Sequence, residues 1–211
     1  MRRALLISLA LVLALVGGSA VCAEDGFYVI PTMKGNYAPV PKTGQTVSNY
    51  PRDDGAFQKG MAWPTPRFTD NNNGTVTDNL TGLIWQKNAN AFQIVPTGLT
   101  QALLDAQGLA NGIAGLTDGS KAGDWRLPNI DELMSLNAYT KKNPSLPAGH
   151  PFINVQATGY PVGAWYWTTT TSPQSGPGPN PWVWVVNFTN SATSYSYYGD
   201  FNYVWCVRGG P

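Results

Sequence analysis

The chain has 211 residues, with 13 Lys and Arg against 12 Asp and Glu, so its net charge is close to zero. This length is enough for one good hydrophobic core. Phosphate backbones are bound through many basic contacts, and the few basic residues here are scattered, which argues against nucleic acid as a partner. The 23 Gly and 17 Pro predict many turns and short strands.

Residues 1–23 have the pattern of a secretory signal peptide. Arg2 and Arg3 form a positive n-region, an apolar run covers residues 4–16, and Val21-Cys22-Ala23 offers a cleavage site. The apolar run is shorter than the roughly 20 residues that span a membrane. We therefore expect a secreted or periplasmic, envelope-associated protein with no membrane insertion after cleavage. Loss of the two arginines leaves a mature chain of net charge −1.

The cysteine content depends on where the signal is cleaved. Cleavage after Ala23 leaves Cys206 alone, whereas cleavage after Ala20 keeps Cys22 and permits one disulfide. Cys206 lies in the apolar run Tyr203–Val207, so we expect a small buried hydrophobe. A reactive thiol would need polar or basic neighbours.

The next residues show no sustained hydrophobic period. We assign residues 24–51 to a loop-rich N-terminal arm with a candidate strand at 27–30, and residues 52–211 to a single domain. Residues 67–87 predict two β-hairpins. In the first, Asn73-Gly74 is a strong tight-turn signal because both residue types tolerate positive φ.

Two helices are expected. Residues 99–114 carry an apolar stripe with Thr100 as the cap. The stripe consists of Ala102, Leu103, Ala106, Leu109, Ala110 and Ile113. Residues 130–139 form the second helix, where Asn129 and Glu132 have the spacing of a capping box. Leu133, Leu136 and Ala138 of this segment are expected to point inward.

Four strands are expected to follow the helices, with a flexible loop at 172–181 between the first two. Their ranges are 165–171, 182–188, 193–198 and 203–208. Strand and motif positions predict a core location for five tryptophans: Trp85, Trp125, Trp167, Trp184 and Trp205.

Five segments, in this order, resemble one known family. They are Arg67–Asn90, Asp124–Leu136, Tyr166–Ser172, Trp184–Phe188 and Tyr203–Gly210. Together they resemble the DUF1566 family, named also for the C-terminal domain of a Legionella collagen-like adhesin. That family is similar to C-type-lectin-like domains and to the sulfatase-modifying fold. The resemblance implies a single α+β domain with two helices, small antiparallel sheets and long ordered loops. It also implies surface attachment, which in the adhesin is associated with sulfated glycosaminoglycans.

Catalysis is not expected. His150 is the only histidine and lies in a Pro- and Gly-rich loop with no acid partner indicated. Asp131 and Glu132 are explained by the first turn of a helix, where acids are favoured. The sulfatase-modifying relatives hold copper with a cysteine pair that this chain does not clearly supply. Three alternatives stay open: a metalloenzyme of that type, a structural envelope component, and a binding protein diversified by a retroelement.

Calcium is the one cofactor with candidate ligands. Asp70, Asn72 and Asp78 surround a Gly turn as an oxygen-rich loop. Counted from Asp70, Gly74 and Thr81 occupy the fifth and twelfth positions, so the loop lacks the EF-hand pattern of Gly at the sixth and an acid at the twelfth. We therefore expect no cofactor, with calcium as the weaker alternative.

The C-terminal run predicts a binding surface. The candidate ligand-binding residues are Trp182, Tyr195, Tyr197, Tyr198, Asp200 and Asn202. Exposed Tyr and Trp stack on sugars or anchor protein partners, and ordinary sheet packing is the alternative. Tyr195 and Tyr197 share one face by alternation, whereas Tyr198 faces the other side or enters the turn. We expect a non-catalytic adhesion module that recognises a polysaccharide or a surface protein, as a monomer or a homo-oligomer.

Overall fold

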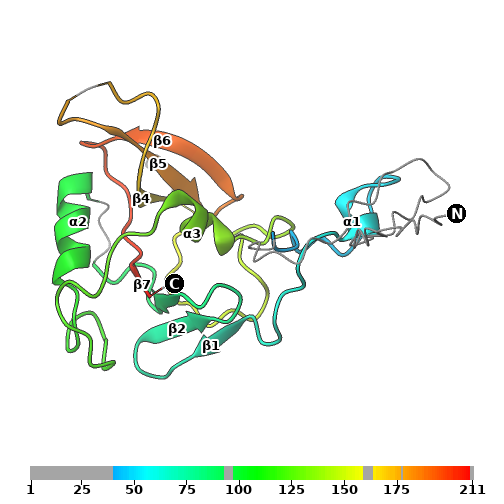
Figure 1. The fold of residues 1–211 in the computed structure, drawn as a ribbon, viewed down its shortest axis with the longest axis horizontal. Helices are drawn as coiled ribbons and strands as arrows, with labels where there is room; N and C mark the ends of the chain where they lie inside the picture. The colour runs from blue at the N-terminus through cyan, green and yellow to red at the C-terminus, as the bar shows by residue number, and fades with distance from the viewer. Residues whose placement is uncertain (1–39, 93–96, 159–163, 177, 210–211) are drawn as a thin grey trace, which may run out of the picture. The chain divides into compact units, whose positions relative to one another are not determined.

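The computed structural model describes residues 40–92, 97–158, 164–176 and 178–209, which lie in one compact unit of the chain, Pro39–Pro211 (Figure 1). In chain order the elements are α1 (Asp54–Phe57), β1 (Phe68–Asp70), β2 (Thr75–Asp78), β3 (Ile84–Gln86), α2 (Leu99–Gly108), α3 (Ile130–Ser135), β4 (Trp165–Thr171), β5 (Trp182–Asn187), β6 (Ala192–Tyr197) and β7 (Val207–Arg208). The expected mixed α+β fold is confirmed, with a third short helix. The closer likeness to C-type lectins stays a prediction, and the candidate strand at 27–30 lies outside the described residues. No helix in the described ranges is long and apolar enough to cross a membrane.

The strands form two antiparallel sheets. One has the order β1-β2-β3-β7 and the other the order β4-β5-β6, in which the strands lie side by side in Figure 1. The predicted hairpin of β1 and β2 is present. Its positive φ angles fall on Asn72 (57°) and Gly74 (83°) rather than on Asn73. A Cβ at Gly74 would lie 2.5 Å from the carbonyl oxygen of Gly115, so this close approach requires glycine.

The three-stranded sheet has a core cluster on each face. Alternation along β4 sends Tyr166 to one face and Trp167 to the other. Tyr166 packs with Leu133 of α3 and with Trp85 of the four-stranded sheet, in one buried cluster. Trp167 packs with Ala102 of α2 in a second cluster. The sheet is therefore buried on both sides near β4, and β6 is left at its edge.

Helix α3 begins where the capping box predicts. The Asn129 side chain accepts from the Glu132 backbone N–H at 2.8 Å, and the Glu132 carboxylate accepts from the Asn129 N–H at 2.8 Å. The helix ends at Ser135, four residues before the predicted end, because the chain turns to pair with Ser145, whose carbonyl accepts from the Ala138 N–H at 2.9 Å. The three residues predicted to point inward, Leu133, Leu136 and Ala138, are buried.

Helix α2 is shorter than predicted and has a different cap. It ends at Gly108 rather than at 114, and its N-cap is Gly98, which makes no side-chain cap bond, so the prediction of Thr100 was wrong. Within the predicted stripe Ala102, Ala106 and Leu109 are buried, whereas Leu103 and Ile113 are 44% and 46% exposed. After Gly108 the chain folds into turns, with positive φ at Gly112, Ala114 and Gly115.

The last predicted strand is also shorter. Only Val207 and Arg208 form β7, while Tyr203 makes an isolated parallel bridge to Tyr166. Four of the five tryptophans predicted for the core are buried: Trp85, Trp125, Trp167 and Trp205. The fifth, Trp184, is only half-buried, and its neighbours on β6 explain why.

Candidate ligand-binding surface

The register between β5 and β6 gathers four aromatic side chains on one face. Trp182 lies opposite Tyr197, and Trp184 lies opposite Tyr195. Because side chains two apart on a strand share a face, these four rings form one cross-strand group. We call Trp182, Trp184, Tyr195 and Tyr197 the aromatic platform.

The rings of the platform contact one another while staying accessible. The Trp182 ring lies 5.6 Å from Tyr195 and 5.4 Å from Tyr197, and Trp184 lies 6.1 Å from Tyr195, measured between centroids. Such pairs contribute about 0.5–1.5 kcal/mol each beyond area burial. Trp182 is nevertheless 36% exposed and Tyr195 is 44% exposed. The platform is thus ordered before any ligand arrives.

The Tyr197 hydroxyl stays protonated at neutral pH. Desolvation first, and then the neighbouring Tyr198, raise the pKa of Tyr197 above its ordinary value. The two rings meet edge to face with centroids 4.7 Å apart. Tyr198 itself is half-buried against the second core cluster, below the platform. Tyr198 therefore packs beneath Tyr197 and is not part of the platform. This agrees with the expectation that Tyr198 faces the other side or enters the turn after β6.

Asp200 closes the turn that follows β6. Its Oδ2 atom accepts from the Tyr197 backbone N–H at 2.8 Å and from the Ser196 hydroxyl at 2.8 Å. The Asp200 N–H donates in turn to the Tyr197 carbonyl at 2.8 Å. The carboxylate therefore lies at the edge of the sheet on the side of Ser196, away from the platform.

Asn202 is buried, with 3% of its surface exposed. Its Nδ2 donates to the Ser196 hydroxyl at 2.9 Å. Its backbone exchanges two hydrogen bonds with Thr97, at 2.9 and 3.1 Å. The structure therefore brings Trp182, Tyr195 and Tyr197 together on one face, and places Asp200 and Asn202 on the other.

That other face carries a cavity of about 530 Å³. It is lined by Trp165, Val185, Ser194, Tyr195, Ser196, Gly199, Asp200, Phe201 and Asn202. Of these nine residues, only Tyr195, Asp200 and Asn202 were in the predicted site. Phe201, which is 60% exposed, follows the turn, where strand alternation gives no signal. On the platform the prediction missed Trp184, which was assigned to the core although alternation from Trp182 could have placed it there.

The calcium candidates are spread along the first hairpin. Asp70 lies opposite Val76 and Asp78 lies opposite Phe68, at the two ends of the β1–β2 pairing. Asp70 is paired with Lys87 at 2.6 Å. Asp78 is buried and paired with Arg67 at 2.8 Å. In the described part of the chain no three His, Cys, Asp or Glu side chains group as a metal site. The expectation of no cofactor, with calcium as the weaker alternative, stays a prediction.

The single histidine lies in a second hollow, of about 390 Å³, between residues 63–68 and 147–150. His150 is half-buried and its ring faces Phe152 with centroids 6.0 Å apart. Burial lowers the pKa of His150 below its ordinary value. The imidazole is therefore largely neutral at neutral pH and packs as part of the fold.

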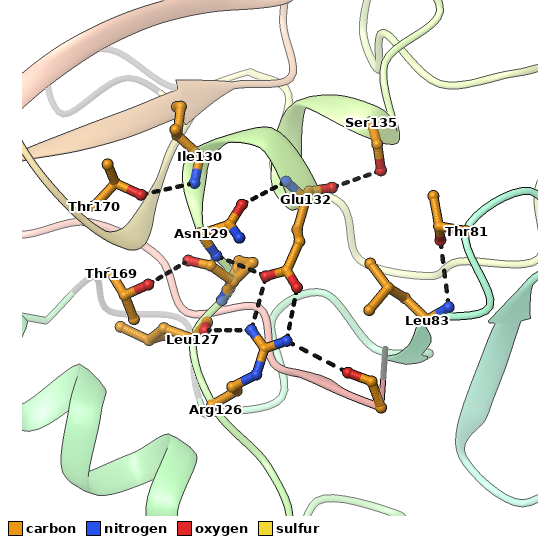
Figure 2. A network of polar contacts seen from close by, with 12 residues as sticks. Thr81, Leu83, Arg126, Leu127, Asn129, Ile130, Glu132, Ser135, Thr169 and Thr170 are labelled. Atoms are coloured by element: carbon orange, nitrogen blue, oxygen red, sulfur yellow. Dashed lines mark hydrogen bonds and ion pairs between the residues drawn. The ribbon is translucent and has the colours of Figure 1, made fainter. Parts of the chain in front are cut away.

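The Trp-Arg-Leu-Pro segment forms a polar network that holds the domain together (Figure 2). The two terminal nitrogens of Arg126 donate to the two carboxylate oxygens of Glu132, both at 2.7 Å. This bond raises the pKa of Arg126. The Ile130 N–H donates to the Thr170 hydroxyl of β4 at 3.0 Å. Figure 2 shows these groups pointing toward one another, so the segment is structural.

Comparison with known families now identifies the domain. The family model of the Lcl C-terminal domain, that of the Legionella collagen-like protein, matches residues 74–208. This match covers more than half of the chain, which therefore belongs to the Lcl C-terminal domain family, also called DUF1566. Membership suggests an adhesion-type module with a surface role. No curated protein and no solved structure matches the chain.

Proposed function

We propose that this protein is a secreted or envelope-associated, non-catalytic adhesion module that binds a polysaccharide on its aromatic platform. One observation carries the proposal: an exposed ladder of Trp and Tyr rings, fixed by the β5–β6 register, within the region that matches the family. Tyr and Trp give large contact areas at low cost in conformational entropy.

The shape of the platform favours an extended sugar chain. The apolar faces of sugar rings stack on aromatic side chains, while tyrosine hydroxyls and the indole N–H supply hydrogen bonds at the edges. Two rows of rings on neighbouring strands can contact more than one sugar unit. Cross-strand contacts between the rings stabilise this arrangement.

The charge of the chain and the side-chain chemistry of the platform favour sugar binding that needs neither a cluster of basic residues nor a metal ion. The mature chain expected after signal cleavage carries a net charge of −1, so long-range attraction of acidic polymers is weak. Rings and hydroxyls make up the platform, and hard cations such as calcium prefer carboxylate and carbonyl oxygens. We propose binding that is independent of calcium.

A glycan array tests this proposal. The protein without residues 1–23 would be applied with and without EDTA, alongside Trp182→Ala and a control, Tyr50→Ala, whose ring is 76% exposed and outside the matched region. We expect binding that survives EDTA, is lost in Trp182→Ala and persists in Tyr50→Ala. Thermal melts within a few degrees of each other would show that all three proteins fold.

Two results would overturn the proposal. Binding that EDTA abolishes would require a metal site in place of the platform. An absence of glycan binding in both conditions would exclude the polysaccharide, and retention of a surface protein by the wild type but not by Trp182→Ala would then make that protein the ligand of the platform.

A further inference from the structure

The cavity behind β6 combines the chemical groups that recognise a single sugar unit. Its volume of about 530 Å³ lies within the roughly 300–1,000 Å³ of small-molecule sites. Phe201, 60% exposed, supplies an aromatic wall beside the serine hydroxyls of β6. Two of the lining residues, Val185 and Asn202, are buried, with 2% and 3% of their surface exposed, so tight packing holds their side chains in place.

A chain of hydrogen bonds orients the polar groups of the cavity. Asn202 donates to Ser196, which donates to Oδ2 of Asp200. Both donors to the Asp200 side chain, the Ser196 hydroxyl and the Tyr197 N–H, use Oδ2. In the described part of the chain Oδ1 has no partner, so it is free to accept from a ligand hydroxyl. Hydrogen bonds to a carboxylate are about twice as strong as those between neutral groups.

The negative charge of Asp200 in the cavity favours uncharged sugars over acidic ones. Asp200 is the only charged side chain among the described residues that line it, and no ion pair joins it to a cation within the described ranges. A carboxylate or sulfate on the ligand would therefore meet a like charge, which disfavours binding. A hydroxyl on the same position would instead donate to Asp200.

We propose that this cavity is a subsite for one uncharged, hydroxyl-rich sugar unit, in which Phe201 stacks on the ring and Asp200 accepts from its hydroxyls. The inference rests on the proposed function, because it names the sugar class that the module takes. Tyr195 belongs to the platform and also lines the subsite, whereas Ser194 and Ser196 of the subsite alternate with the platform tyrosines along β6. The subsite therefore adjoins the platform at the edge strand, where it can take a branch or a chain end beside a chain on the platform.

Monosaccharide titrations monitored by backbone amide NMR test the subsite. The probes are methyl β-glucoside and its charged counterpart, methyl β-glucuronide. We expect the glucoside to shift the amides of residues 199–202 with a Kd of about 1 mM, a value common for weak single-site ligands near −4 kcal/mol. We expect the glucuronide to bind at least about fivefold more weakly, since like charges repel.

Four variants assign the effect to named side chains. Phe201→Ala should weaken glucoside binding about tenfold, and Phe57→Ala, whose ring is 49% exposed, should leave it unchanged. Asp200→Asn keeps an oxygen that can accept from the Tyr197 N–H, so the turn should persist while the preference against the glucuronide disappears. Asp131→Asn removes the same charge at an exposed site on α3 and should leave the preference intact.

The outcomes separate this inference from the proposed function. Trp182→Ala should abolish polysaccharide binding yet leave the glucoside titration unchanged. If the glucoside shifts no amide at residues 199–202, or if the glucuronide binds as tightly as the glucoside, the inference is wrong while the platform can still bind. If the glucoside binds normally and the array shows no platform-dependent binding, the platform proposal fails and the subsite remains.

Discussion

Glu132 receives three hydrogen bonds on one carboxylate: two from the Arg126 guanidinium, both at 2.7 Å, and one from the Asn129 backbone N–H at 2.8 Å. The first two tie the extended Trp-Arg-Leu-Pro segment to α3, and the third caps the helix. Burial alone would raise the pKa of Glu132, but the bonds from Arg126 and Asn129 outweigh it and lower the pKa below its ordinary value of 4.5.

Replacement of Glu132 by Gln should therefore destabilise the domain and change its response to acid. Gln keeps a side-chain oxygen that can accept from the Asn129 N–H, as in a capping box, so the substitution removes chiefly the ion pair, whose Arg126 side chain is 45% exposed. We expect a loss of less than about 1 kcal/mol at neutral pH, measured by urea unfolding.

The acid response follows from the direction of the shift. Because the folded pKa of Glu132 is lowered, its stabilisation is fully present above 4.5 and is lost as the pH falls through the folded value. The difference between wild type and Glu132→Gln should shrink in that window. A difference that stays constant from neutral pH down to strongly acidic pH would contradict this reading.

Asp78 and Asp70 each form an ion pair, one buried and one partly exposed, so their contributions to stability can be compared. Asp78 is fully buried with Arg67, whereas Asp70 and Lys87 are each more than one quarter exposed. Removal of one partner from a buried pair costs about 3–5 kcal/mol, while an exposed pair contributes about 0–1 kcal/mol. Urea midpoints should therefore fall much further for Asp78→Ala than for Asp70→Ala, and equal losses would refute the distinction.

Cys206 should be inert in the folded protein. The thiol is fully buried, and burial first, with Asp105 second, raises its pKa well above the ordinary value. Thiolate is the reactive form. In the chain without residues 1–23, a thiol reagent at mildly alkaline pH should label nothing until denaturant is added, and then one cysteine. Rapid labelling of the native protein would show that the segment around Cys206 opens.

Asp53 organises the segment that contains α1. Its side chain accepts from the N–H groups of Asn49, Tyr50 and Ala56, and chiefly the bond from Asn49 lowers its pKa to about 2. We expect Asp53→Ala to speed hydrogen exchange at those three amides while β4 and β5 keep their protection. Slower or unchanged exchange at Asn49 would show that another contact holds this loop.

Local chemistry explains which elements could be predicted from the sequence. The capping box needs only Asn129 and Glu132, three residues apart, and the observed bounds of β4, Trp165–Thr171, equal the predicted range. The end of α2 depends on distant partners: the Gly123 N–H donates to the Gln107 carbonyl at 2.8 Å, and the Asn111 N–H to the Ser120 carbonyl at 3.0 Å. The apolar periodicity of residues 99–114 does not reveal these hydrogen bonds, so the sequence pattern could not predict where α2 ends.

The candidate ligand-binding residues were predicted to form one surface, and the structure distributes them over two neighbouring parts of the β5–β6 pair. Alternation correctly put Tyr195 and Tyr197 on one face, but the place of Trp184 follows from the β5–β6 register, which no single segment encodes. Asn202 is buried because its backbone pairs with Thr97 across 105 positions of the chain. Contacts of that range arise only in the folded chain.

The most direct test of platform binding is a calorimetric titration, in EDTA, of the strongest glycan from the array into wild type and Trp182→Ala. We expect a Kd at least about tenfold weaker for the variant, which corresponds to a loss of about 1.4 kcal/mol. An unchanged Kd in a folded Trp182→Ala protein would contradict the aromatic platform as the binding surface.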